Sequence, residues 1–117
     1  MNRFAALGLA VEAASGKRII VITRTLRQNA DVLDQLVAVP EASHCIAKTR
    51  RANGEQSIEY LSGGTVRIRS HGQGTRGMSA DIIFLDDGVD QLVSVPHGWA
   101  CLNASLAASP HGVLVRT

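Results

Sequence analysis

Apolar residues recur along the chain with two periods, one typical of helices and the other typical of strands. The first segment, residues 3–15, spaces four apolar side chains at intervals of three and four, namely Phe4, Leu7, Val11 and Ala14. This spacing predicts an amphipathic helix, which Gly16 ends. The β-branched run at residues 19–23 then predicts a strand that is covered on both faces.

A second helix is predicted by a capping box, because Gln28 follows Thr25 by three residues. The helix should run to about Val39 and end at Pro40, since proline removes a backbone donor. Its buried stripe is expected to contain Leu26, Ala30, Leu33 and Val37. A short strand at residues 44–49 and a polar turn at residues 50–54 should follow.

Two alternating segments, residues 57–61 and 65–69, flank a Ser-Gly-Gly sequence. This arrangement predicts a β-hairpin. The apolar residues Val66 and Ile68 should face the core. Because side chains alternate along a strand, Arg67 and Arg69 should share the opposite face.

The most hydrophobic strand, residues 81–85, stops at two consecutive acids. Residues 89–109 are predicted to be mostly helical, and residues 112–117 form a last strand. The alternation of helices and strands predicts an α/β fold with three layers, a mostly parallel sheet and one β-hairpin. At 117 residues, the chain 1–117 is expected to form a single domain.

Composition adds an aliphatic core, because 45% of the residues are hydrophobic and only 3% are aromatic. No apolar run approaches the roughly 20 residues that span a bilayer, so no membrane partner is expected. Glu12 interrupts the first apolar stretch and argues against a signal peptide. We therefore expect a cytoplasmic protein with Cys45 and Cys101 reduced; a bridge between them is the alternative.

The net charge of +2 arises from two unequal parts of the chain: residues 1–76 carry +5 and residues 77–117 carry −3. Eight basic residues near strand ends, turns and the hairpin could contact a nucleic-acid backbone. They are Arg24, Arg27, Lys48, Arg50, Arg51, Arg67, Arg69 and Arg76. Few aromatic side chains are present, so backbone contact is favoured over base stacking. Ordinary surface charge is the alternative.

Asp86 and Asp87 follow an apolar strand, where ligands of α/β proteins bind at the carboxyl edge of the sheet. Asp86 could hold Mg²⁺, and Asp87 could orient or deprotonate a water molecule. A solvated pair of loop acids is the alternative. The Walker A phosphate loop is missing, because Gly16-Lys17 lies between a helix and a strand and lacks the required pattern.

A second glycine-rich segment, residues 72–77, has the spacing Gly-x-Gly-x-x-Gly. A dinucleotide site requires that such a loop open a helix, and here a strand follows instead. Its backbone N–H groups, together with Arg76, nevertheless suit an oxyanion. The four histidines lie without ligand spacing, so no metal cluster is expected.

Taken in order, these segments resemble the ATPase core of phage terminase large subunits and helicase-like P-loop proteins. Residues 76–87 are the most specific match, since an Arg-Gly turn leads into a Walker B-like strand. Residues 17–25, 57–69 and 113–117 are similar to the strand after the Walker A helix, the paired strands and the strand that ends in the coupling Thr. The resemblance implies a truncated RecA-like core that lacks Walker A, with Asp87 in place of the usual Glu.

Three functions follow from the resemblance and the basic residues. The first is a small phage-type DNA-binding protein on a degenerate ATPase core, oligomeric because a truncated sheet leaves an open edge. Such a protein would require no cofactor, although it could bind Mg²⁺. The second is a metal-dependent ATPase or nuclease that uses Asp86, Asp87 and Asp90, with the phosphate site supplied by another chain. The third is a structural or host-interaction protein. Whether the chain is an enzyme is left open, because a Walker B-like strand is present and Walker A is absent.

Overall fold

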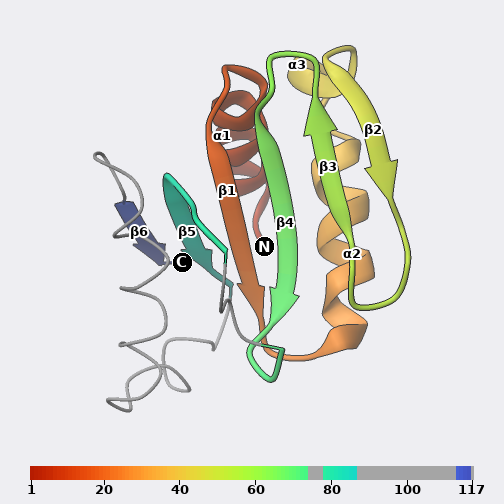
Figure 1. Ribbon diagram of the computed structural model, residues 1–117, viewed down its shortest axis with the longest axis vertical. Helices are drawn as coiled ribbons and strands as arrows, with labels where there is room; N and C mark the ends of the chain where they lie inside the picture. Colours follow the sequence, from red (N-terminus) through yellow and green to blue (C-terminus); the bar gives the residue numbers. More distant parts are fainter. Residues whose placement is uncertain (74–77, 87–112, 117) are drawn as a thin grey trace.

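The computed structural model describes residues 1–73, 78–86 and 113–116. Within these residues six strands form one sheet in the order β2-β3-β4-β1-β5-β6 (Figure 1). The parallel pairings join β1 (Arg18–Thr23), β4 (Thr65–Ser70), β5 (Ile82–Leu85) and β6 (Val113–Arg116). The antiparallel pairings join β4 to β3 (Ser57–Tyr60) and β3 to β2 (Ile46–Arg50). The expected α/β fold with a largely parallel sheet and a β3–β4 hairpin is therefore present.

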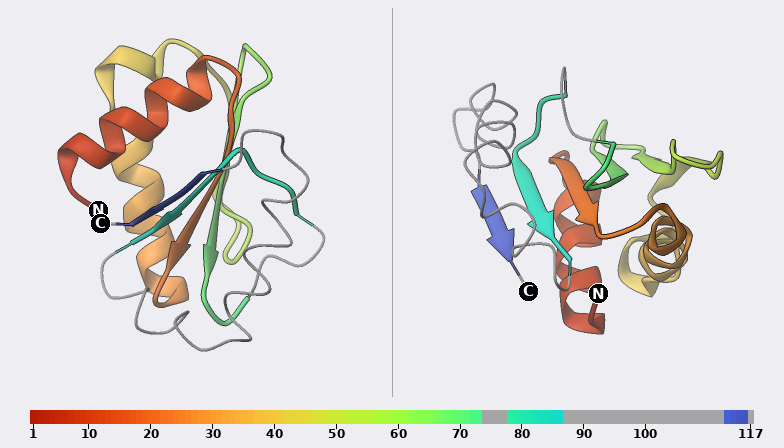
Figure 2. Two further views of the ribbon diagram at one scale, coloured as in Figure 1. Left: turned by 90° about the vertical axis from the view of Figure 1, so that its left-hand side faces the viewer. Right: turned by 90° about the horizontal axis from the view of Figure 1, so that it is seen from below.

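The helices of the described residues cover one face of this sheet (Figures 1 and 2). They are α1 (Arg3–Ala14), α2 (Leu26–Val37) and the single turn α3 (Pro40–Ser43). One apolar cluster joins side chains of all these helices to side chains of β1, β3, β4 and β5. The described residues thus form two layers. The helix expected at residues 89–109, which would supply the third layer, lies outside the described residues.

Strand β1 is buried on both faces, as its β-branched run predicted. Ile19 and Val21 join the cluster under the helices. Ile20 and Ile22 belong to a second cluster on the other face of the sheet, together with residues of β5 and Ala80. A central parallel strand must be apolar on both faces for this reason.

The helix α1 is present, but its predicted stripe is only partly right, because Leu7 and Ala14 pack against the core and the other two residues do not. Phe4 and Val11 are 76% and 44% exposed. The buried side chains are Ala6, Leu9, Ala10 and Ala13. Helix α1 carries apolar residues around most of its circumference, so spacing alone did not identify the buried side. The small alanine side chains face inward because they allow the helix axis to approach its neighbours closely.

The predicted stripe of α2 is also partly wrong. Leu33 is buried and Val37 packs against the core, but Leu26 and Ala30 are exposed. The buried positions are Asn29, Val32, Leu33 and Leu36. A polar residue, Asn29, at the N-terminal end of the buried face broke the apolar pattern on which the prediction depended.

The end of α2 and both ends of β2 differ from the predicted boundaries by one or two residues. Helix α2 ends at Val37, and Pro40 opens α3 because its missing N–H is tolerated in the first turn of a helix. The strand predicted at residues 44–49 is observed as β2, Ile46–Arg50. No helix among the described residues is both long and apolar enough to cross a membrane.

Candidate nucleic-acid interface

The face of β2, β3 and β4 that lies opposite the helices carries polar and charged side chains. In the strand register Arg50 pairs with Ser57, and Ser57 pairs with Arg67. Arg67 is exposed, whereas its neighbours Val66 and Ile68 are fully buried under the helices. Arg69 lies two residues further along β4 and therefore on the same face. The predicted separation of arginines from core residues in this hairpin is confirmed.

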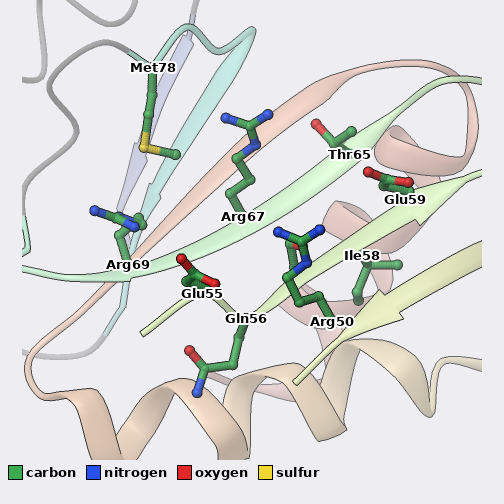
Figure 3. A pocket seen from close by; sticks show the side chains of 10 residues that line it. Arg50, Glu55, Gln56, Ile58, Glu59, Thr65, Arg67, Arg69 and Met78 are labelled. Carbon is green, nitrogen blue, oxygen red and sulfur yellow. The ribbon is translucent and has the colours of Figure 1, made fainter. Parts of the chain in front are cut away.

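These arginines border a hollow of about 360 Å³ on the open face (Figure 3). Arg50 enters it from β2, and Arg67 and Arg69 enter it from β4. The remaining lining residues are Glu55, Gln56, Ser57, Ile58, Glu59, Thr65 and Met78. Met78 also packs against the second apolar cluster. The hollow therefore lies where the charged half of this face meets its apolar half.

A β-bulge turns Lys48 and Arg50 of β2 toward the open face of the sheet. Ile46 pairs with Tyr60, which faces the helices, and a register shift follows between Ile46 and Lys48. After this shift Lys48 pairs with Glu59 and Arg50 pairs with Ser57. Simple alternation would place Ile46 and Lys48 on one face, but the extra residue of a bulge reverses that order.

The hollow contains three arginines and two glutamates, so its formal charge is positive. Within the described part of the chain, the guanidinium groups of Arg50 and Arg67 have no ion-pair partner. Arg69 donates a hydrogen bond of 3.4 Å from Nη1 to the carbonyl of Gly54. Two guanidinium groups with available donors can bind phosphate oxygens through paired hydrogen bonds.

The other predicted basic residues divide among different surfaces. Lys48 shares the open face without lining the hollow. Arg51 lies against α2, where its Nη1 is 2.7 Å from Oδ1 of Asp34. Arg24 and Arg27 are exposed at the junction of β1 and α2 and do not line the hollow. Arg76 lies outside the described residues. The structure thus gathers three of the eight predicted residues into one concave site.

Asp86 lies at the carboxyl end of β5 and is only 4% exposed. Its backbone N–H donates to the carbonyl of Ile22 at 2.9 Å. Its Oδ1 lies 3.2 Å from the amino nitrogen of Met1, so the start of α1 and the end of β5 meet here. Asp87 and Asp90 lie outside the described residues. The end of β5 is therefore a buried acidic position rather than a solvated loop.

A magnesium ion at Asp86 would need further oxygen ligands. No group of three His, Cys, Asp or Glu side chains that could hold a metal occurs in the described part of the chain. Mg²⁺ commonly takes one or two carboxylates together with water and substrate phosphates. Asp86 is one carboxylate of this kind, and Asp87 lies outside the described residues.

Sequence reasoning missed several residues of the hollow. The alternation of β3 could have predicted that Glu59 lies on the open face. Ile58 and Tyr60 on either side of it are core residues, so Glu59 must point the other way. Glu55, Gln56 and Met78 carried no such signal, because they precede a strand or lie in a connection. Their place in the hollow depends on how the segments pack.

Comparison with known proteins shows a similarity of structure rather than of sequence. No family model matches the sequence, and neither does any curated protein. The crystal structure of the HK97 bacteriophage large terminase is similar, with a TM-score of 0.56 and 17% sequence identity. The similarity covers 90% of this chain and 22% of the terminase chain. This chain therefore has a terminase-like fold, as the sequence resemblance predicted.

Proposed function

We propose that this chain is a small phage-type DNA-binding protein built on a terminase-like α/β fold. The DNA backbone would contact the open face of β2, β3 and β4, with Arg50, Arg67 and Arg69 as the principal contacts. The observation that carries this proposal is the hollow in which these arginines converge from two strands. The terminase-like fold supports the same interpretation.

The register explains why the arginines can act together. Arg50 and Arg67 are separated by one intervening strand, which is roughly 10 Å between backbones, and Arg69 is about 7 Å along β4 from Arg67. Arg50 and Arg67 have no ion-pair partner among the described residues. Their charges therefore remain available to neutralise phosphates and release counterions.

Glu55 and Glu59 limit the charge of the hollow and shape what binds there. A uniformly basic surface binds any polyanion, whereas carboxylates beside arginines repel phosphates that are out of position. We therefore expect moderate affinity that depends strongly on salt. Lys48, Arg24 and Arg27 would add weaker contacts on the surrounding surface.

A salt-dependent binding titration with single- and double-stranded DNA tests the proposal. The Arg67→Gln variant should bind more weakly at every salt concentration, and the slope of log K against log salt should fall by about one. Arg51→Gln is the matched control, because it removes the same charge from an exposed residue paired with Asp34. Equal losses of DNA affinity in the two variants would mean that affinity depends on net charge and not on the position of Arg67. No binding of either DNA at low salt would overturn the proposal and favour a structural or host-interaction role.

A second candidate function is metal-dependent hydrolysis of a nucleotide or of DNA at Asp86. It is favoured by the burial of that carboxylate at the end of a central parallel strand. Asp86 and Asp87 would hold Mg²⁺, which would polarise a phosphate, and a partner chain would supply the phosphate loop. Phosphate release and DNA cleavage measured with Mg²⁺ test this candidate. Mg²⁺-dependent DNA cleavage that is lost in Asp86→Asn would support the nuclease form of this candidate, and no cleavage of any DNA by the chain would exclude that form.

A further inference from the structure

Gln73 follows β4 by three residues and contacts three separate segments of the chain. Its Oε1 accepts a hydrogen bond from the backbone N–H of Ser70 at 2.7 Å and from Nδ2 of Asn29 at 3.3 Å. Its Nε2 donates to the carbonyl of Gly54 at 2.6 Å. One side chain thus joins the end of β4, the first turns of α2 and the turn between β2 and β3.

The Gly54 carbonyl connects Gln73 to the arginine hollow. The same oxygen accepts a hydrogen bond from Nη1 of Arg69 at 3.4 Å. Gly54 has a φ of +82°, and a Cβ at this position would lie 3.0 Å from Nε2 of Gln73. Glycine is therefore favoured both by the backbone conformation and by the close approach of the glutamine.

The other end of this network is anchored in the protein interior. Asn29 is fully buried, and its Nδ2 lies 3.5 Å from Oε1 of Gln56, a residue of the hollow. The hydroxyl of Thr23, at the end of β1, hydrogen bonds to Oδ1 of Asn29 and lies 3.0 Å from the carbonyl of Thr25. Buried polar groups keep their partners because losing one leaves an uncompensated donor or acceptor. The network therefore holds the Gln73 amide in one orientation.

We propose that Gln73 is a positioning residue for the DNA-binding hollow. It fixes the Gly54 carbonyl, and that carbonyl orients the Arg69 guanidinium before DNA arrives. This inference rests on the proposed function of the same site. Ordering a long side chain in advance should improve affinity by about threefold to tenfold, because binding no longer has to restrict its rotamers.

The Gln73→Met variant tests this role, since it keeps the length of the side chain and removes its amide. DNA affinity should fall by about threefold to tenfold. Gln35→Met is the matched control, because Gln35 lies on α2 away from the hollow and donates to the carbonyl of Met1 at 2.9 Å. Its affinity for DNA should equal that of the wild type. If Gln73→Met does not fold, Gln73→Asn keeps a neutral amide but shortens the side chain, so that its donor no longer reaches the Gly54 carbonyl, and the same loss is expected.

Two readouts separate positioning from a merely structural role. In an Arg69→Gln background, Gln73→Met should cause no further loss of affinity, because its effect passes through Arg69. In the DNA-free protein, the NMR signal of the Arg69 guanidinium should show faster exchange with water in Gln73→Met than in the wild type. Additive losses of affinity, or identical Arg69 signals, would overturn the inference.

Failure of the proposed function would be recognised separately. If the wild type binds neither single- nor double-stranded DNA, the proposed function is overturned. The Arg69 spectra of the two proteins would still decide whether Gln73 orders that guanidinium. If the wild type binds DNA and Gln73→Met binds equally well, only the positioning role is overturned.

Discussion

Gly64 packs directly against the backbone of Ala13, which joins the β3–β4 hairpin to the end of α1. A Cβ at Gly64 would overlap the carbonyl oxygen of Ala13 and lie 2.8 Å from its carbonyl carbon. Ser62 adds a hydrogen bond of 3.3 Å from its hydroxyl to the same carbonyl. The hairpin turn thus contacts α1 through main-chain atoms that cannot move aside cheaply.

Gly64→Ala should lower the free energy of unfolding by roughly 2–3 kcal/mol, because the added methyl group forces the turn away from α1. Urea denaturation measures the change. Gly8→Ala is the matched control: Gly8 lies in α1 with open space around it, and alanine there should raise stability by about 0.5–1 kcal/mol. Wild-type stability in Gly64→Ala would contradict the close contact.

Tyr60→Phe should stabilise the protein and change its response to alkaline pH. The Tyr60 hydroxyl is buried and has no hydrogen-bond partner among the described residues, so removing it should gain about 1 kcal/mol. Burial, with a smaller contribution from nearby Cys45, raises the pKa of Tyr60 to about 12. The folded state therefore keeps its proton more tightly than the unfolded state, and stability is lost as pH rises from about 10 to about 12.

Urea denaturation at a series of pH values from neutral to alkaline measures this effect. At about 1.4 kcal/mol per pKa unit, the contribution of Tyr60 amounts to roughly 2–3 kcal/mol. Between about pH 10 and about pH 12, the Tyr60→Phe variant should therefore lose roughly 2–3 kcal/mol less stability than the wild type. Parallel curves for the two proteins would show that Tyr60 titrates as it does in the unfolded chain.

Arg18→Met should destabilise the protein by about 1–2 kcal/mol, because Arg18 makes several charge-assisted hydrogen bonds. Its Nε donates to Oδ2 of Asp81 at 3.4 Å, and its Nη2 lies 3.2 Å from Oδ1. Its Nη1 donates to Ser79 at 2.9 Å. Arg51→Met is the comparison, since its pair with Asp34 is more exposed and should contribute less than about 0.5 kcal/mol. Thermal unfolding should rank Arg18→Met below Arg51→Met, and the reverse order would be inconsistent with these contacts.

Asn29→Ala should cost about 1–3 kcal/mol, because it removes a hydrogen-bond partner from the buried hydroxyl of Thr23 and from the amides of Gln56 and Gln73. Asn29 is fully buried and lies within hydrogen-bond distance of Thr23, Gln56 and Gln73. Asn53→Ala, an exposed change in the turn after β2, should alter stability by less than about 0.5 kcal/mol. Chemical denaturation of both variants measures the difference, and equal stabilities would argue against a buried network at Asn29.

The strands were predicted more accurately than the buried faces of the helices. Alternation along β4 placed Val66 and Ile68 in the core and Arg67 on the other face, because the period of a strand is fixed by its backbone. In α1 the same approach was wrong for Phe4 and Val11, because apolar residues surround the helix and Phe4 satisfied the spacing as well as Ala6 did. In α2 the buried Asn29 concealed the true stripe, because a polar core residue can be identified only from its partners.

For the basic residues, too, the sequence determined some features and the tertiary structure determined others. The sequence alone determined that Arg67 and Arg69 share a face, because two residues apart on one strand is a local relationship. Only the tertiary structure decided that Arg50 joins them while Arg51 pairs with Asp34 on α2. That choice depends on the bulge in β2 and on its pairing with β3, which are contacts between segments distant in sequence. Local periodicity fixes the direction of a side chain, whereas the composition of a site depends on which strands become neighbours.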